Sequence, residues 1–244
     1  LTFKKKIVLI TGAESGIGKS TSKIFLNNNF RVIGTSLKKN KDKYIKDFDN
    51  YQIDITNNTE WRELASIILK KYCKIDVLVN SAGVRLSGNL ETTSMNDWSY
   101  HFSNNVTGTF LACKYILPLL KKSNKSSIIN LASINSIRGV KNMLAYATSK
   151  SAIVSFTASL ALDLSKHNIR VNAVAPGAID TPMLASFKKD LTSKEYQKRM
   201  RDNHPIGRIG KPEEVASVIY FLASEASSFM TGLTIPVDGG RSIR

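Results

Sequence analysis

The sequence predicts a doubly wound α/β fold, in which helices cover both faces of a parallel β-sheet. Short β-branched apolar runs alternate along the chain with longer amphipathic segments. The runs are apolar at every position rather than at every second one, as in strands that are buried on both faces of a parallel sheet. Since no Pro-, Gly- or Ser-rich linker divides the chain, one domain over residues 1–244 is expected.

Each run and each segment between runs has the length of one element. The predicted strands are Ile7 to Ile10, Arg31 to Thr35, Val77 to Val79, Ile128 to Leu131, Val171 to Ala175 and Leu233 to Val237. The predicted helices are 17–28, 59–72, 94–120, 145–166 and 212–223.

Residues 178–211 interrupt this alternation. They are polar, contain Pro182, Gly207 and Gly210, and follow a predicted strand. Ligands of open α/β sheets bind beyond the carboxyl ends of the strands, so this segment is expected to be a substrate loop. A plain surface insertion is the alternative.

Composition excludes several classes of protein. Of the 244 residues, 42% are hydrophobic and 22% charged, which excludes a disordered chain. No run approaches the ~18–20 apolar residues of a membrane span. The basic start, Leu1 to Lys6, precedes too short an apolar run for a secretory signal, so a cytoplasmic location is expected.

The chain is strongly basic, with a formal net charge of +16 from 35 Lys and Arg against 19 Asp and Glu. The lysines lie in short clusters such as Lys70-Lys71, without the aromatic-interleaved stripe or zinc-finger pattern of nucleic-acid binders. We therefore expect neither a nucleic-acid nor a membrane partner, and interpret the charge as solvated surface. Anionic ligands or partners remain open.

Cysteines and histidines indicate neither disulfides nor a metal. Cys73 and Cys113 are too few for a disulfide framework, and both lie in predicted helices, where we expect them to be buried. His101, His167 and His204 form no ligand-spaced pair, so no catalytic metal is expected.

A glycine-rich turn follows the first strand, with the sequence Thr11-Gly12-Ala13-Glu14-Ser15-Gly16-Ile17-Gly18. Glycines there permit a tight turn and let the backbone approach a pyrophosphate, whose charge the helix N-terminus stabilises. The spacing differs from that of the standard dinucleotide fingerprint, and no Gly-Lys-Ser/Thr follows at the place that a P-loop requires. An ordinary glycine-rich turn is the alternative.

Tyr146 and Lys150 open a predicted helix at a spacing of i, i+4. That spacing stacks both side chains on one helix face, ~5–6 Å apart at Cβ. A lysine cation beside a phenol favours the phenolate and lowers the tyrosine pKa from ~10, as an acid/base requires. An exposed aromatic–lysine pair is the alternative.

Motifs in order along the chain complete the pattern of one family. They are Thr11-Gly12-x-x-x-Gly16-Ile17-Gly18, Asp54-Ile55-Thr56, Asn80-Ser81-Ala82-Gly83, Asn105-Val106-Thr107-Gly108, Ser133, Tyr146-x-x-x-Lys150, Pro176-Gly177 and Val237-Asp238-Gly239-Gly240. The chain resembles the single-domain short-chain dehydrogenase/reductases over essentially its whole length, most closely members like the 3-oxoacyl-[acyl-carrier-protein] reductases. The resemblance implies a three-layer Rossmann fold with a parallel sheet of about seven strands, and a homotetramer.

The resemblance also implies a role for each catalytic residue. Tyr146 is the acid/base that exchanges a proton with the carbonyl oxygen, and Ser133 hydrogen-bonds the same oxygen. Lys150 binds the nicotinamide ribose and depresses the pKa of Tyr146. Asn105 holds a water that links Lys150 to solvent.

The resemblance implies a cofactor site formed by Gly12, Ser15, Gly16, Ile17, Gly18, Ser36, Leu37, Lys38, Asp54, Ile55, Asn80, Ala82, Gly83, Tyr146, Lys150, Pro176, Gly177, Ile179 and Thr181. Two positions depart from the family. Ser81 replaces a second asparagine, and Glu14 places a carboxylate where a small residue is usual, which is unfavourable near a pyrophosphate unless it points to solvent.

The cofactor is NADP or NAD. The second strand ends without the acidic residue that holds the ribose 2′-hydroxyl of NAD, and Ser36 stands in its place. Thr35, Ser36, Lys38 or Lys39 are available to bind a 2′-phosphate, which favours NADP. Against this, no arginine stands at Leu37 and no basic residue at Ser15, so NAD remains open.

The substrate pocket is expected after Gly83, after Ser133 and in 178–211. The expected substrate-binding residues are Ser133, Asn135, Val140, Met143, Tyr146 and Met183, with Val84, Arg85, Ile134, Arg138, Gly139, Ala178 and Phe187 as further lining. Arg85 and Arg138 suit a substrate with a carboxylate or thioester, with solvent-facing arginines as the alternative.

The function predicted is NAD(P)-dependent interconversion of a ketone and a secondary alcohol, with a 3-oxoacyl thioester as the candidate substrate. An acidic carrier would suit the basic surface around Lys121, Lys122, Lys125 and Lys166. The alternatives are an NAD-dependent dehydrogenase of a small alcohol or hydroxy acid, and a non-catalytic NADP sensor.

Overall fold

In the computed structural model, residues 5–38, 45–185 and 193–244 are described, and their strands form one seven-stranded sheet in the order β3-β2-β1-β4-β5-β6-β7. All neighbouring strands are parallel. The strands are β1 (Ile7–Thr11), β2 (Arg31–Ser36), β3 (Phe48–Gln52), β4 (Val77–Asn80), β5 (Ser126–Leu131), β6 (Ile169–Pro176) and β7 (Thr234–Val237). The predicted fold class is confirmed.

β3 is the strand that the apolar pattern did not predict. Its sequence is Phe-Asp-Asn-Tyr-Gln, and none of its residues is fully buried. It forms the edge of the sheet beside β2, where one side of a strand lacks a neighbour and polar residues are tolerated. An edge strand therefore needs no continuous apolar run.

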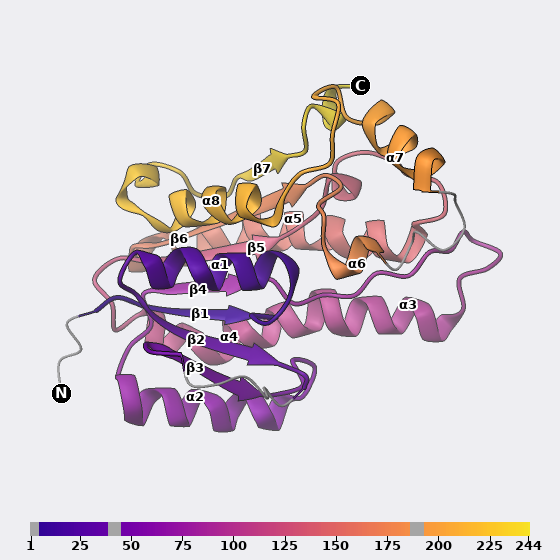
Figure 1. Cartoon of the computed structure of the whole chain (residues 1–244). Helices are drawn as coiled ribbons and strands as arrows, with labels where there is room; N and C mark the ends of the chain where they lie inside the picture. Colours follow the sequence, from indigo (N-terminus) through magenta and orange to yellow (C-terminus); the bar gives the residue numbers. More distant parts are fainter. Residues whose placement is uncertain (1–4, 39–44, 186–192) are drawn as a thin grey trace.

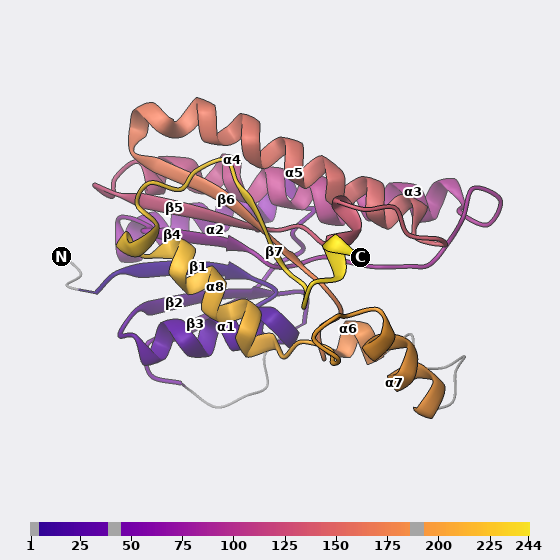
Figure 2. The ribbon, with the colours of Figure 1, turned by 90° about the horizontal axis from the view of Figure 1, so that it is seen from above.

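Helices cover both faces of the sheet (Figures 1 and 2). Ile7 and Leu9 of β1 pack with α2 and α4, whereas Val8 and Ile10 pack with α1 and α8. Successive side chains of a buried strand thus enter opposite cores, which explains the continuous apolar runs. The longer helices are α1 (Gly16–Asn27), α2 (Asn58–Tyr72), α4 (Gly108–Leu120), α5 (Leu144–Leu164) and α8 (Pro212–Ala223).

The helix predicted at 94–120 is interrupted. It begins as α3 (Met95–His101), where Ser94 and Asp97 form a capping box, and widens into the π-helical segment η1 (Phe102–Thr107) before α4. π-Helical turns inside α-helices are frequent at functional sites. Here the turn carries Asn105, which is buried.

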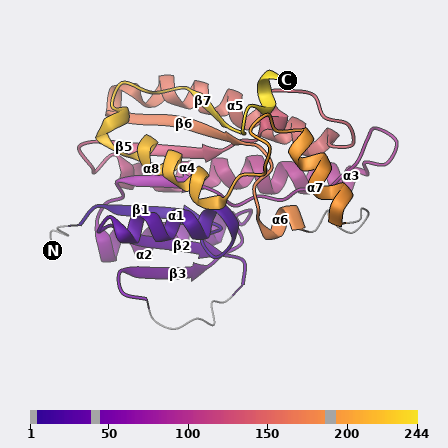
Figure 3. The same cartoon turned by 45° about the horizontal axis from the view of Figure 1, so that its top comes forward.

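The strands end at one edge of the sheet, called here the carboxyl edge. Beyond it lie α6 (Pro182–Ala185), α7 (Ser193–Asp202) and the C-terminus, as Figure 3 shows. The remaining short helical turns are η2 (Ile134–Ser136), η3 (Ser165–His167), η5 (Glu225–Ser227) and η6 (Arg241–Ile243). The described parts of the predicted substrate loop therefore lie at the edge where ligands of open sheets bind.

One cysteine was predicted wrongly. Cys113 is buried in α4, but Cys73 is exposed. α2 ends at Tyr72, and Cys73 takes a left-handed conformation with φ 66°, which turns its side chain out of the helix packing. Among the described helices, none has the length and apolarity needed to cross a membrane.

Candidate active site

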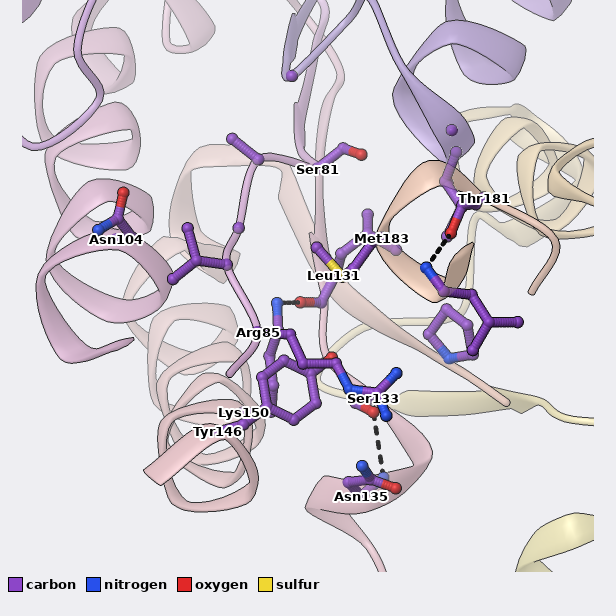
Figure 4. A pocket seen from close by; sticks show the side chains of 18 of the residues that line it. Ser81, Arg85, Asn104, Leu131, Ser133, Asn135, Tyr146, Lys150, Thr181 and Met183 are labelled. Atoms are coloured by element: carbon purple, nitrogen blue, oxygen red, sulfur yellow. Dashed lines mark hydrogen bonds between the residues drawn. The ribbon is translucent and has the colours of Figure 1, made fainter. Parts of the chain in front are cut away.

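A cavity of about 1220 Å³ opens at the carboxyl edge. Its wall is built from the glycine-rich turn, the ends of β2, β4, β5 and β6, and residues of α3, η1, α5 and α7. Figure 4 shows Arg85, Ser133, Tyr146 and Lys150 together at one side of this space. Residues far apart in the sequence meet here because parallel strands end together.

The glycine-rich turn is held against the end of β4. Thr11 Oγ1 accepts hydrogen bonds from the backbone N–H groups of Ser81 and Ala82, both at 3.0 Å. Gly12 has φ +66°, and a Cβ there would lie 3.1 Å from the Cα of Ala82. Gly12 is thus required both by its backbone conformation and by the close approach of a second chain segment.

The first turn of α1 faces the cavity and fits an anionic group. Ser15, Gly16 and Ile17 line the cavity, α1 has no side-chain cap, and its first turn contains no acidic residue. Its N–H groups and helix dipole are therefore available to the phosphates of a dinucleotide. Across the opening, Thr181 Cγ2 lies 3.0 Å from the position of a Cβ on Gly16, so larger side chains would obstruct this cradle.

Most predicted cofactor residues line the cavity: Gly12, Ser15, Gly16, Ile17, Ser36, Leu37, Asp54, Ile55, Ala82, Gly83, Tyr146, Lys150, Pro176, Gly177, Ile179 and Thr181. Thr35 lines it too, whereas Lys39 lies outside the described residues. The residues present thus fit a dinucleotide.

Three predicted cofactor residues do not line the cavity. A Cβ on Gly18 would lie 2.1 Å from the oxygen of Gly12, so Gly18 packs α1 against the turn. Lys38 is exposed outside the cavity wall. Asn80 is buried and donates through Nδ2 to Asn130 Oδ1 at 2.8 Å, which joins β4 to β5.

α5 places Tyr146 and Lys150 one helical turn apart on the cavity wall, both buried. Ser133, just beyond β5, is close enough to the phenol of Tyr146 to lower its pKa. The backbone N–H of Asn135 donates to Ser133 Oγ at 3.1 Å and orients that hydroxyl. The three side chains that sequence reasoning assigned to the chemistry thus meet on one wall.

The surroundings of Tyr146 include a second cation besides Lys150, and the effect of Lys150 on its pKa stays a prediction. Burial raises the pKa of Tyr146, while the hydrogen bond from Ser133 and the positive charge of Arg85 lower it. Lys150 donates through Nζ to the oxygen of Leu131 at 2.6 Å, and burial lowers its own pKa to about 8. Arg85 is thus a cation that favours the Tyr146 phenolate, against the larger effect of burial.

Asn105 is buried behind the residues that line the cavity and does not line the cavity itself. Its Oδ1 accepts from the N–H of Val84 at 2.8 Å, and its Nδ2 donates to Val84 O at 3.0 Å and Ser149 Oγ at 2.9 Å. A Cβ on Gly83 would lie 2.9 Å from that Oδ1 and 3.4 Å from Lys150 Nζ. Asn105 thus fixes the segment beyond β4, and its role in holding a water stays a prediction.

Arg85 is held over the ring of Tyr146, with its guanidinium carbon 5.9 Å from the ring centroid. The neighbouring Leu86 N–H donates to Nε2 of the buried His101 at 2.9 Å. Burial lowers the pKa of Arg85. The second arginine, Arg138, does not line this cavity but an adjoining smaller hollow with Gly139, so it is not a partner of Arg85.

The predicted substrate residues Ser133, Asn135, Val140, Met143, Tyr146 and Met183 all line the cavity, as do Val84, Ile134 and Ala178. Phe187 lies outside the described residues. Sequence reasoning missed the wall formed by Asn96, Ser99, Tyr100, Ser103 and Asn104, and also Tyr196 and Met200 of α7. The spacing of the first five, at three and four residues, was the signal for a polar helix face.

The lysine cluster proposed for an acidic carrier lies at the opposite edge. Lys121, Lys122 and Lys125 follow the C-terminus of α4 and precede β5, and Lys166 precedes β6. By helix rise, Lys121 is roughly 24 Å from the level of Asn105. A carrier bound there would face the amino ends of the strands, away from the cavity, and this location stays a prediction that the structure does not favour.

In the described part of the chain, no group of three or more His, Cys, Asp or Glu side chains is arranged to hold a metal ion.

Comparison with known proteins bears on the whole chain. A family model described as Enoyl-(Acyl carrier protein) reductase matches residues 12–242. The chain is 39% identical to the 3-oxoacyl-[acyl-carrier-protein] reductase FabG of Thermotoga maritima, over 98% of this chain and 99% of that protein.

Solved structures agree. A ligand-free aldohexose dehydrogenase of Thermoplasma acidophilum is 36% identical with a TM-score of 0.93, covering 98% of this chain and 95% of that one. A structure of ElxO with NADP bound is 34% identical with a TM-score of 0.92, covering 98% and 100%. The chain belongs to the short-chain dehydrogenase/reductase family of NAD(P)-dependent oxidoreductases.

Proposed function

We propose that Tyr146 is the acid/base of a reaction that interconverts a ketone and a secondary alcohol. The observation that carries this proposal is the meeting of Ser133, Tyr146 and Lys150 on one buried wall beside the glycine-rich turn. When bound, the nicotinamide supplies or accepts the hydride.

The protein supplies the proton and stabilises charge. In the reductive direction, the Tyr146 hydroxyl donates its proton to the carbonyl oxygen as charge develops there. The Ser133 hydroxyl donates a hydrogen bond to the same oxygen. The Arg85 guanidinium, over the Tyr146 ring, stabilises the phenolate that remains, while Lys150 is placed to bind ribose hydroxyls.

NADP is the proposed preferred cofactor. β2 ends without an acidic side chain, and Ser36 lines the cavity in its place. The similar structure of ElxO, 34% identical, is described with NADP bound. Titration of the wild-type chain with NADPH and with NADH, followed by fluorescence, measures this preference directly.

The proposed substrate is a 3-oxoacyl thioester, supported by the 39% identity to the reductase of Thermotoga maritima. A small hydroxy acid is the second candidate, because the half-buried Arg85 cation lies on the cavity wall, where it could also contact a substrate carboxylate. A carrier-bound substrate would enter from the carboxyl edge.

A homotetramer is proposed on the basis of apolar side chains left exposed. Phe110 of α4 is 46% exposed and Leu162 of α5 is 79% exposed, and beyond α8 Phe229 is fully exposed. Such side chains on neighbouring elements are typical of surfaces that bind a second protein chain. Sedimentation measures the oligomeric state, and Leu162→Glu should weaken the association of the subunits.

Three sequence interpretations stay predictions. They are one domain over residues 1–244, a cytoplasmic location, and the lack of nucleic-acid and membrane partners.

Replacing Tyr146 tests the proposed chemistry. Tyr146→Phe removes only the hydroxyl, so turnover should fall about a thousandfold while the dissociation constant (Kd) of NADPH changes little. Activity is measured with a 3-oxoacyl thioester and with small oxo acids. Retained turnover would assign the acid elsewhere, and a wild type that binds NADPH without turning over any ketone would favour a sensor.

A further inference from the structure

Asn50, on the edge strand β3, joins the glycine-rich turn to the end of β2. Its Nδ2 donates to Glu14 Oε1 at 2.7 Å and to Ser36 Oγ at 2.9 Å. Since both acceptors share one nitrogen, the Glu14 carboxylate lies roughly 5 Å from the Ser36 hydroxyl. Gly34 makes room for this bridge, because a Cβ there would be 2.7 Å from Asn50 Oδ1.

Ser36 occupies the place at which an acidic residue of this fold holds the ribose 2′-hydroxyl. Its own hydroxyl proton is already used, because Oγ donates to Lys38 O at 2.8 Å. A serine has one donor, so Ser36 presents only acceptor capacity to a ligand in this arrangement. Lys38 is exposed and does not line the cavity.

We propose that Glu14 is a specificity-determining residue for the cofactor: its half-buried carboxylate lies outside the cavity wall but acts across the roughly 5 Å to Ser36, which lines the cavity where β2 lacks an acidic residue. Its charge opposes a 2′-phosphate and tolerates a 2′-hydroxyl, and therefore reduces the preference for NADPH over NADH. The inference rests on the proposed cofactor site, and concerns how that site discriminates between the two dinucleotides.

A purely structural role for Glu14 makes a different prediction. If the carboxylate only tied the turn to β3, its neutralisation would alter the affinity for both dinucleotides equally. A charge effect acts on the 2′-phosphate alone, and salt screens it. The ratio of the two affinities therefore separates the two roles.

Glu14→Gln removes the charge and keeps an oxygen that can accept from Asn50. Kd is measured by calorimetry for NADPH, NADH, adenosine 2′,5′-bisphosphate and AMP, the last two lacking the nicotinamide. We expect about tenfold tighter binding of the two 2′-phosphate ligands and less than twofold change for the others. This gain in affinity for the 2′-phosphate ligands should shrink at high salt, because salt screens the charge of Glu14.

Glu91→Gln is the matched control, because Glu91 is exposed on a distant loop and its loss changes the net charge equally. It should leave all four Kd values unchanged. If thermal unfolding shows that Glu14→Gln does not fold, Glu14→Ala replaces it in the experiment. The same tighter binding of the two 2′-phosphate ligands is expected for Glu14→Ala.

An unchanged NADPH-to-NADH ratio in folded Glu14 variants would overturn the inference and leave the proposed function standing. An equal change in Glu91→Gln would overturn it as well, because net charge would then explain the effect. Failure of the proposed function shows separately, as a wild-type chain that binds the dinucleotides and turns over no ketone.

Discussion

The amino edge of the sheet, where the strands begin, and the carboxyl edge, where they end, differ in whether charged side chains are favoured. At the amino edge, where β2 and β3 begin, Arg31 forms ion pairs with Asp47 and Asp49, and Tyr72 also donates to Asp49. Although burial acts against it, hydrogen bonds from Tyr72 and Arg31 hold the pKa of Asp49 below its usual value. The charged forms are the favoured ones here.

At the carboxyl edge the balance is reversed. Burial lowers the pKa of Lys150 and of Arg85, and raises that of Tyr146. Each charged form is disfavoured, because burial removes water from these groups and has the largest effect on the pKa of each. The ionised side chains thus stabilise the fold at the amino edge, whereas at the carboxyl edge they destabilise it, as is common where side chains serve a functional site.

Among the substitutions that compare the two edges, Lys150→Met has the largest expected effect. Turnover should fall at least about a hundredfold, since the proposed ribose contact and the buried ammonium are lost. The free energy of unfolding should nevertheless rise by about 2 kcal/mol at pH 7, because a desolvated charge is removed. Urea unfolding of the wild type and of Lys150→Met measures this difference in the free energy of unfolding.

The pH dependence of this stability difference is specific. The native pKa of Lys150 is lowered to about 8 from 10.5, so the penalty is complete below pH 8 and disappears as the pH rises towards 10.5. Wild type and Lys150→Met should therefore converge in stability at high pH. A wild type that is more stable than the variant at pH 7 would contradict this account of the carboxyl edge.

At the amino edge, Asp49→Asn should destabilise the fold by about 2 kcal/mol at pH 7, since Arg31 loses a partially buried partner. The pKa of Asp49 is lowered from 3.8, so its contribution is present above that pH and is lost as the pH falls through the native pKa. Urea unfolding at pH 7 and near pH 3 checks both statements.

The matched control for Asp49 is Glu225→Gln, whose exposed pair with Lys125 at 3.0 Å should contribute less than about 0.5 kcal/mol. Equal effects of the two substitutions would show that burial does not distinguish the amino-edge network from ordinary surface pairs.

His204 gives the smallest expected effect. Its Nε2 accepts from the Ala178 N–H at 3.1 Å and Nδ1 bonds Met200 O, which ties α7 to the end of β6. Burial lowers the pKa of His204 from 6.5, so stability is complete above pH 6.5 and is lost on acidification. Between pH 7.5 and 5 we expect a loss of about 1 kcal/mol.

His204→Gln retains an acceptor that does not titrate, so the loss of thermal stability between pH 7.5 and 5 should be smaller than in the wild type. Equal acid sensitivity in both chains would assign the effect to other groups.

Sequence reasoning identified the side chains that are proposed for the chemistry, but not the charges and burial that surround them. The i, i+4 spacing placed Tyr146 and Lys150 on one helix face, and the glycine-rich turn was located to the residue. The balance of effects on the pKa of Tyr146 could not be predicted, because spacing does not reveal that Lys150 donates to Leu131 O or that Arg85 lies over the ring. Burial and long-range charge depend on segments that only folding brings together.

By itself, the sequence determined the fold class, the family and the side chains available for chemistry, because these follow from local periodicity and from short motifs. The tertiary structure alone decided that β3 is an edge strand, that the Lys121 cluster faces away from the cavity, and that Asn50 links Glu14 to Ser36. The physical reason is that parallel strands bring distant segments to one edge, and the order of the strands sets which charges meet there.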